Sequence, residues 1–238
     1  MHPRPIFQTL SVLGLLLALL AMATRTVEPA SKPSSADPNE KQDPSFVSIQ
    51  DDPNLPRVLL LGDSISMGYT LPVRQLLAGK ANVHRPPVNC GPTKRGLAQL
   101  DKWLGDGKWD VIHFNFGLHD LRLDDGKHQV PLPDYETNLR TIVQRLQKTG
   151  AKLIWATTTP VPDAEVNPPR RSADVIAYNA AAAKIMTESG IAIDDLYALV
   201  KPRLEELQLP ANVHYTLPGY NVLGHQVAES LLRALNSH

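Results

Sequence analysis

The sequence is poor in cysteine and has no excess of charge. Cys90 is the single cysteine, so the chain cannot form a disulfide within itself, and we expect its thiol to be buried, with a reactive thiol as the alternative. Lys plus Arg and Asp plus Glu both number 24, which leaves no field of one sign to attract nucleic acid. The eight histidines form no His-x-His or His-Glu-x-x-His pattern, so no metal site is expected.

The sequence also lacks an apolar run long enough to cross a bilayer, which takes roughly 20 residues. The longest run, residues 11–21, follows the basic Arg4 and ends in small residues at Ala23. This order is typical of a signal peptide. We therefore expect residues 1–23 to be cleaved and the protein to be exported, either to a periplasm or out of the cell. An uncleaved signal segment would be its one contact with a membrane.

The rest of the chain divides into a linker and one domain. Residues 24–55 are rich in Pro, Ser, Asp, Glu and Lys, which predicts a disordered linker, and residues 56–238 are long enough for one core. Short apolar runs predict buried strands at 57–61, 81–84, 111–116, 152–157 and 191–194. Amphipathic stretches between them predict helices at 68–77, 93–104, 135–148, 173–188 and 218–235. This alternation indicates an α/β fold, with a mainly parallel five-stranded sheet between two layers of helices.

The turn after the first predicted strand contains a candidate nucleophile. Gly62, Asp63 and Ser64 follow the strand directly and lead into a helix. Ligands of open parallel sheets bind at the carboxyl ends of the strands, where this turn places Ser64. The amides at the start of the helix can stabilise negative charge on a reacting oxygen. Ser64 is therefore a candidate nucleophile, with helix capping as the alternative role.

A candidate base lies near the end of the sequence, on the segment that enters the last predicted helix. His214 is followed by Thr216 and Pro218, which suit the first turn of a helix. A serine hydroxyl is a weak nucleophile until a base takes its proton, and imidazole titrates in the useful range. A lone histidine is more often an ordinary surface residue, but its combination with Ser64 favours nucleophilic catalysis.

Four segments occur in order along nearly the whole predicted domain: Gly62-Asp63-Ser64, Gly91, 117–120 and Val213-His214. Together they resemble the four blocks of the SGNH/GDSL hydrolase family. The resemblance implies a flavodoxin-like three-layer α/β/α sandwich that hydrolyses or transfers acyl esters. It also implies that Ser64 is the nucleophile and that the amides of Ser64 and Gly91 help to form an oxyanion hole. For Gly91, a turn without a catalytic part is the alternative.

The third block departs from the family pattern. It usually reads Gly, any residue, Asn, Asp, and the Asn amide donates to the oxyanion, whereas this sequence has His119 in that position. A ring N–H could replace the amide, and Asn115 is a second candidate donor because strand side chains alternate. An ordinary loop role, bonded to backbone, is the alternative for His119. We expect Asp120 to brace the loops, as a supporting residue like Asp63.

The segment before His214 is a second departure. The family commonly has an aspartate three residues before the histidine, and this chain has Ala211 there. The ring must then be held by a backbone carbonyl, by Asn212 or by an acid from elsewhere in the sequence. We expect a dyad of Ser64 and His214.

These observations predict an exported serine esterase that needs no cofactor or metal. Its expected partners are small-molecule or polysaccharide esters, with O-acetyl groups on carbohydrates favoured, and nucleic acid is not among them. The alternative is a weakly active or inactive protein of the same fold that binds carbohydrate, which His119 and Ala211 keep open.

Overall fold

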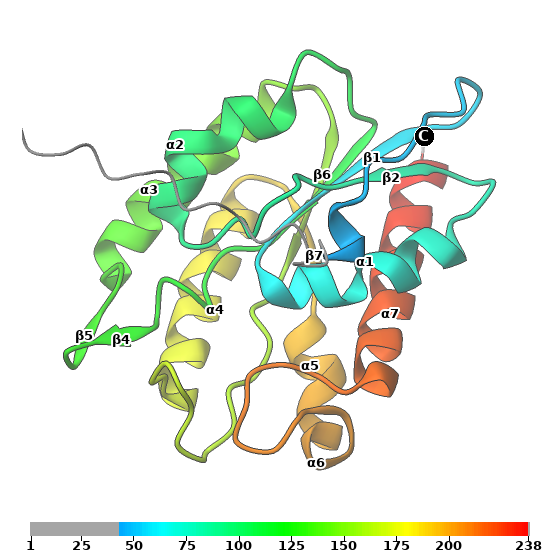
Figure 1. Ribbon diagram of the computed structural model, residues 1–238. Coiled ribbons are helices and arrows are strands. Elements are labelled where there is room, and N and C mark those ends of the chain that lie inside the picture. Colours follow the sequence, from blue (N-terminus) through cyan, green and yellow to red (C-terminus); the bar gives the residue numbers. More distant parts are fainter. Residues whose placement is uncertain (1–42, 238) are drawn as a thin grey trace, which may run out of the picture. The chain divides into compact units, whose positions relative to one another are not determined.

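A five-stranded parallel sheet forms the centre of the domain (Figure 1) in a computed structural model that describes residues 43–237. Its strands are β1 Arg57–Leu61, β2 Asn82–His84, β3 Val111–Phe114, β6 Lys152–Ala156 and β7 Ala192–Asp194. Their spatial order is β2-β1-β3-β6-β7, and every neighbouring pair is parallel. The strand order reverses between β1 and β3, and ligands of such sheets bind outside this switch point.

Helices cover both faces of the sheet. The long ones are α1 Ser64–Leu76, α2 Thr93–Leu104, α3 Leu132–Gln147, α4 Ser172–Glu188 and α7 Leu217–Asn236. α1 packs against α7 on one face, while α2, α3 and α4 follow one another on the other face (Figure 1). The predicted α/β/α sandwich with a parallel five-stranded sheet is therefore confirmed. Among residues 43–237, no helix has both the length and the apolar character needed to cross a membrane.

Burial on both faces explains why the strands read as apolar runs instead of alternating patterns. In β1, the residues from Val58 to Leu61 are each 1% exposed or less. Cys90 lies at 0% exposure, as expected, and burial raises the pKa of its thiol to about 11. A buried thiol with a raised pKa stays protonated and unreactive.

Short elements were missed by the sequence analysis, because one or two residues or a single turn show no periodicity. They are η1 Pro44–Phe46, β4 Leu123–Asp124, β5 Lys127–His128, α5 Leu196–Val200, η2 Lys201–Arg203 and α6 Leu204–Leu207. The first long helix also begins at Ser64, four residues earlier than predicted. The Asp63 side chain accepts a hydrogen bond from the Ile65 amide and so caps the helix at that point.

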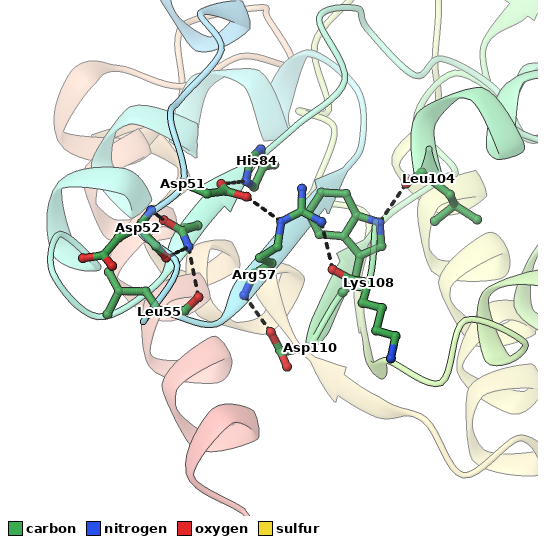
Figure 2. Close-up of polar contacts among 10 residues, drawn as sticks. Asp51, Asp52, Leu55, Arg57, His84, Leu104, Lys108 and Asp110 are labelled. Carbon is green, nitrogen blue, oxygen red and sulfur yellow. Dashed lines mark hydrogen bonds and ion pairs between the residues drawn. The ribbon is translucent and has the colours of Figure 1, made fainter. Parts of the chain in front are cut away.

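The segment before β1 corrects the predicted linker. Figure 2 shows Asp51 between Arg57 and His84, with its Oδ2 atom 2.7 Å from Arg57 Nε, and the Asp52 amide donates to Asn82 Oδ1 at 2.9 Å. Residues 43–55 therefore lie against the domain, and the prediction of disorder is wrong for them. Polar residues that suggested a solvated linker are instead held by specific hydrogen bonds. The predicted signal peptide and residues 24–42 lie outside the described residues.

Candidate active site

Ser64 is the first residue of α1 and stands at the carboxyl end of β1. The turn between them leaves no room for a side chain at Gly62, where an added Cβ would lie 2.7 Å from the Ser66 Cβ. Behind the turn, the buried Arg85 donates to Ser66 Oγ at 3.2 Å and to the Gly62 carbonyl at 3.4 Å. Ser64 itself is only partly buried. The turn thus holds an accessible hydroxyl in a fixed position.

His214 reaches Ser64 from the segment before α7. Its Nε2 atom lies 2.8 Å from Ser64 Oγ, although 150 residues separate the two in sequence. The segment is held from both sides, because the Leu209 amide donates to the His214 carbonyl at 2.9 Å and the Thr216 side chain caps α7. The structure therefore brings together the two residues that the sequence analysis paired.

Asn212 holds the His214 ring, which is one of the three alternatives left open by the sequence. Its Oδ1 atom lies 2.8 Å from His214 Nδ1 and 3.0 Å from the His214 backbone nitrogen. The backbone N–H can only donate, so the atom facing both nitrogens is the carbonyl oxygen. Nδ1 must then carry the ring hydrogen, which leaves Nε2 free to accept a proton from Ser64. Ala211, at φ +48°, makes a sharp turn just before Asn212.

The surroundings of His214 lower the pKa of its imidazole. Partial burial is the largest cause, the positive charge of Arg170 acts in the same direction, and the carboxylate of Asp63 opposes both. A lowered pKa keeps the ring neutral at neutral pH, as a general base requires. Activity that depends on this base should therefore persist below pH 6.5, the ordinary pKa of histidine.

The predicted oxyanion donors differ in how free they are. Ser64 opens α1, so its N–H has no carbonyl to meet within the helix. The Gly91 N–H, by contrast, donates to Asn89 Oδ1 at 2.9 Å in this structure. The amide that was expected to help form the oxyanion hole therefore already has a partner. A substrate oxyanion must draw this amide away from the Asn89 side chain or share it.

His119 is available for the role left open to it. Within residues 43–237 its ring makes no hydrogen bond to the backbone, so the ordinary loop role has no support. Burial lowers the pKa of this imidazole, three nearby guanidinium groups lower it further, and Asp63 opposes them. A neutral ring offers one N–H as a donor. Since the carboxylate of Asp63 acts on both His119 and His214, the two rings share one electrostatic environment.

Asn115 does not take part in the oxyanion hole, contrary to one of the two predictions for this donor. β3 ends at Phe114, so the alternation of strand side chains no longer applies at the next residue. The Asn115 amide donates to the Ala156 carbonyl at 2.8 Å and to Thr158 Oγ1 at 3.2 Å. Asn115 thus joins the ends of β3 and β6 and has a structural role beside the site.

Asp120 braces two loops, as expected. Its Oδ1 atom accepts from the Thr93 backbone at 2.9 Å and from the Thr93 hydroxyl, which ties the loop after β3 to the start of α2. The side chain is fully buried, and burial raises its pKa to about 7. Asp120 is a structural part of the site, and its ionisation is unfavourable in the folded protein.

That charge leads to a stability prediction. Between the ordinary pKa of 3.8 and about 7, the folded state holds a proton on Asp120 that the unfolded state releases. The free energy of unfolding should therefore fall as pH rises through this window. Asp120→Asn removes this loss, so from pH 5 to pH 8 the variant should gain about 2 to 3 kcal/mol relative to wild type in denaturant titrations. If the difference in free energy of unfolding between the two proteins is the same at pH 5 and pH 8, the raised pKa of Asp120 is contradicted. Asp134→Asn, at an exposed site, is the matched control.

A groove beside the catalytic pair has a volume of about 600 Å³. Two of the predicted oxyanion residues, Gly91 and His119, and the exposed cations Lys94 and Arg95 lie in its lining. The other lining residues are Asn89, Pro92 and Gln129. Sequence reasoning missed Lys94 and Arg95, because basic residues on a helix surface are common and carry no signal of their own. Over residues 43–237, no three His, Cys, Asp or Glu side chains are grouped as metal ligands would be.

Comparison with known proteins agrees with the fold. The model of the GDSL-like lipase/acylhydrolase family matches residues 60–222, well over half of the chain. No curated protein matches the chain significantly.

Solved structures with the same fold are esterases of low sequence identity. An acetyl xylan esterase, AlAXEase, is 15% identical with a TM-score of 0.64, over 74% of this chain and 99% of that one. A lipase/acylhydrolase from Enterococcus faecalis is 21% identical with a TM-score of 0.64, over 74% and 95%. The acetylxylan esterase Axe2 from Geobacillus stearothermophilus is 20% identical with a TM-score of 0.62, over 77% and 95%. Because the family model matches most of the chain, the chain belongs to the GDSL-like lipase/acylhydrolase family and is a serine carboxylic ester hydrolase.

Proposed function

We propose that this protein hydrolyses small acyl esters, with Ser64 as nucleophile and His214 as general base. The observation that carries the proposal is the contact of 2.8 Å between Ser64 Oγ and His214 Nε2, with the Nδ1 hydrogen directed at Asn212. Two forms of the Geobacillus stearothermophilus esterase, with a serine and an aspartate replaced by alanine, are described as catalytic mutants. This chain has the serine contact but uses an asparagine where an acid would be expected.

The reaction proceeds in two halves. Ser64 Oγ attacks the ester carbonyl and His214 Nε2 takes its proton, while the Ser64 amide and the His119 ring donate to the developing oxyanion. The intermediate then releases the alcohol, which leaves with the proton from His214, and the acyl group remains on Ser64. Water attacks this acyl ester with His214 again as base, the carboxylic acid departs, and Ser64 regains its proton.

Two groups, Asn212 and Asp63, act on the charge that His214 carries during each half. Asn212 accepts a hydrogen bond from the ring but carries no charge. The Asp63 carboxylate raises the pKa of His214, against the effect of burial. Asp63 therefore supplies part of the stabilisation that an acid on Nδ1 would give.

We favour acylated carbohydrates as the substrates. We also propose that the protein acts outside the cytoplasm. Two of the structural neighbours are acetyl xylan esterases, and the groove beside Gly91 and His119 offers Asn89 and Gln129 as hydrogen-bonding side chains. The apolar run at residues 11–21 supports export. A weakly active carbohydrate-binding protein is the second candidate, which the engaged Gly91 amide favours.

A substrate screen separates these candidates. Purified protein should release nitrophenol from nitrophenyl acetate faster than from a nitrophenyl ester with a long acyl chain, and should release acetate from acetylated xylan. Binding of the deacetylated glycan without turnover of any ester would favour the carbohydrate-binding protein. A preference for long acyl chains would contradict the proposed small acyl group.

Asn212→Asp is expected to raise activity by placing a charge on the Nδ1 side of His214. The new carboxylate should stabilise the protonated ring and increase kcat/KM for nitrophenyl acetate by about tenfold. Since a nearby negative charge raises the pKa of an imidazole, the acidic limb of the pH–rate profile should move to higher pH. Asn212→Leu, the control of similar volume, should lower kcat/KM without moving that limb upward. A profile that stays in place in Asn212→Asp would show that Asn212 does not orient the base.

A further inference from the structure

Two cations line the groove next to the predicted oxyanion residues. Lys94 and Arg95 lie in the first turn of α2, and both side chains are exposed. The Arg95 stem passes over Gly91, since its Cδ lies 3.4 Å from where a Gly91 Cβ would stand. Within residues 43–237, neither cation forms an ion pair with a carboxylate. Lys94 Nζ donates to the Gln129 carbonyl at 3.4 Å, which leaves its charge unneutralised, so both cations can meet a charged ligand in the groove.

Two further guanidinium groups approach the same site from the loops after β3 and β6. Arg170 is fixed by hydrogen bonds from its Nε to the Leu118 carbonyl at 2.8 Å and from its Nη1 to the Pro168 carbonyl at 3.0 Å. Arg122 pairs with Asp124 at 2.8 Å, while its buried Nε finds no partner among the described residues. Carbonyl oxygens position the Arg170 guanidinium without neutralising its charge.

These cations also act on the imidazoles of the site. Positive charge from Arg170, Arg122 and Arg95 adds to burial in lowering the pKa of His119, and Arg170 also acts on His214. The acids that face this region are Asp63, Asp124 and the buried Asp120, whose raised pKa of about 7 weakens its contribution. Asp63 and Asp124 offset two of the four cations, which leaves an excess of positive charge around the groove.

We propose that the ester cleaved at Ser64 belongs to an anionic carbohydrate, whose negative group binds in the groove against Lys94 and Arg95. Arg170, held at the carbonyl of Leu118 next to His119, adds positive charge nearby. This inference rests on the proposed esterase function and narrows its substrate class. Guanidinium groups bind carboxylates and sulfates through paired, charge-assisted hydrogen bonds. A chain with a formal net charge of zero that gathers cations at one site gains selectivity there rather than general attraction to anions.

A matched pair of substrates isolates the charge. O-acetylated methyl glycosides of glucuronic acid and of glucuronamide differ in a carboxylate against an uncharged amide of similar shape. For the full chain at low ionic strength, kcat/KM for acetate release should be about five- to tenfold higher with the acid, as expected for a few partly exposed ion pairs. The ratio should approach one in 1 M salt, where the screening length is about 3 Å. An acetylated glucose 6-sulfate tests whether sulfate is accepted in place of carboxylate.

Variants assign the preference to the groove. Lys94→Gln with Arg95→Gln should reduce the acid-to-amide ratio to about twofold or less, because only Arg170 and Arg122 remain. Lys102→Gln with Lys108→Gln removes the same charge from exposed sites outside this groove and should keep the wild-type ratio. Both double variants change exposed side chains, so their unfolding temperatures should match that of wild type.

The outcomes distinguish this inference from the function beneath it. Suppose that nitrophenyl acetate is hydrolysed, but that acetate is released from the glucuronic acid substrate no faster than from the glucuronamide substrate at low salt. The inference about charge is then overturned, and the proposed esterase function stands. If none of the three esters is hydrolysed, both are overturned. A preference for the acid that survives in the Lys94 and Arg95 double variant would place the anion elsewhere and overturn the assignment to this groove.

Discussion

Ser64→Ala is expected to lower kcat/KM for nitrophenyl acetate by at least about four orders of magnitude, since loss of a serine nucleophile removes the covalent route altogether. Among the described residues, Ser64 is the one hydroxyl that is hydrogen-bonded to His214, at 2.8 Å, and it stands where the amide at the start of α1 can meet the oxyanion. The residual rate should reflect binding and the remaining donors alone. Initial rates at matched protein concentration measure the effect.

The control is Ser48→Ala, which removes an exposed hydroxyl before β1 and should keep the wild-type rate. The loss should also appear as a lower kcat, since the missing interaction belongs to the chemical step and not to ground-state binding. A Ser64→Ala protein that keeps more than about one per cent of the wild-type kcat/KM would require another nucleophile.

His214→Ala is expected to cost a similar factor, on the order of 10⁴ in kcat/KM, because the Ser64 hydroxyl then keeps its proton. The acidic limb of the pH–rate profile, set in wild type by the lowered pKa of His214, should disappear from what remains. The side chain is partly exposed, so added imidazole should enter the space left and recover part of the rate.

Non-additivity is the sharper part of this second prediction. Because Ser64 and His214 act as one unit, the double alanine variant should be as active as the less active of the two single variants. His225→Ala, on the exposed side of α7, is the control and should leave the rate unchanged. A double variant whose losses multiply would mean that the two side chains act independently.

Much of the fold could be predicted because its signals are local. Apolar runs such as the one in β1 indicate strands buried on both faces, and the helix predicted at 93–104 matches α2 to the residue. Packing of the segment before β1 could not be predicted in this way. Its polar composition suggests solvation, and only the positions of Arg57 and His84 in the folded domain give Asp51 its two partners (Figure 2).

The candidate site divides along the same line. The pairing of Ser64 and His214 could be predicted from the type and order of residues, because each lies where a strand or loop meets a helix. The partner of the His214 ring could not, since it depends on the turn at Ala211 and on one side-chain rotamer of Asn212. Alternation along a strand gave the wrong direction for Asn115, which lies just past the end of β3.

The cations of the groove show a further limit of sequence reasoning. Lys94 and Arg95 are adjacent in sequence, whereas Arg170 comes from a separate loop and is directed by the Leu118 carbonyl. Their common location is a property of the tertiary structure. A neutral total charge gives no information about such a local excess.

Mass spectrometry of the protein after reaction with a fluorophosphonate probe tests the central claim most directly, because the probe bonds to a serine only when a base activates it. The adduct should lie on Ser64 in a wild-type digest and be absent from Ser64→Ala and His214→Ala. An adduct on a different residue, or an active esterase that the probe leaves unmodified, would contradict the account.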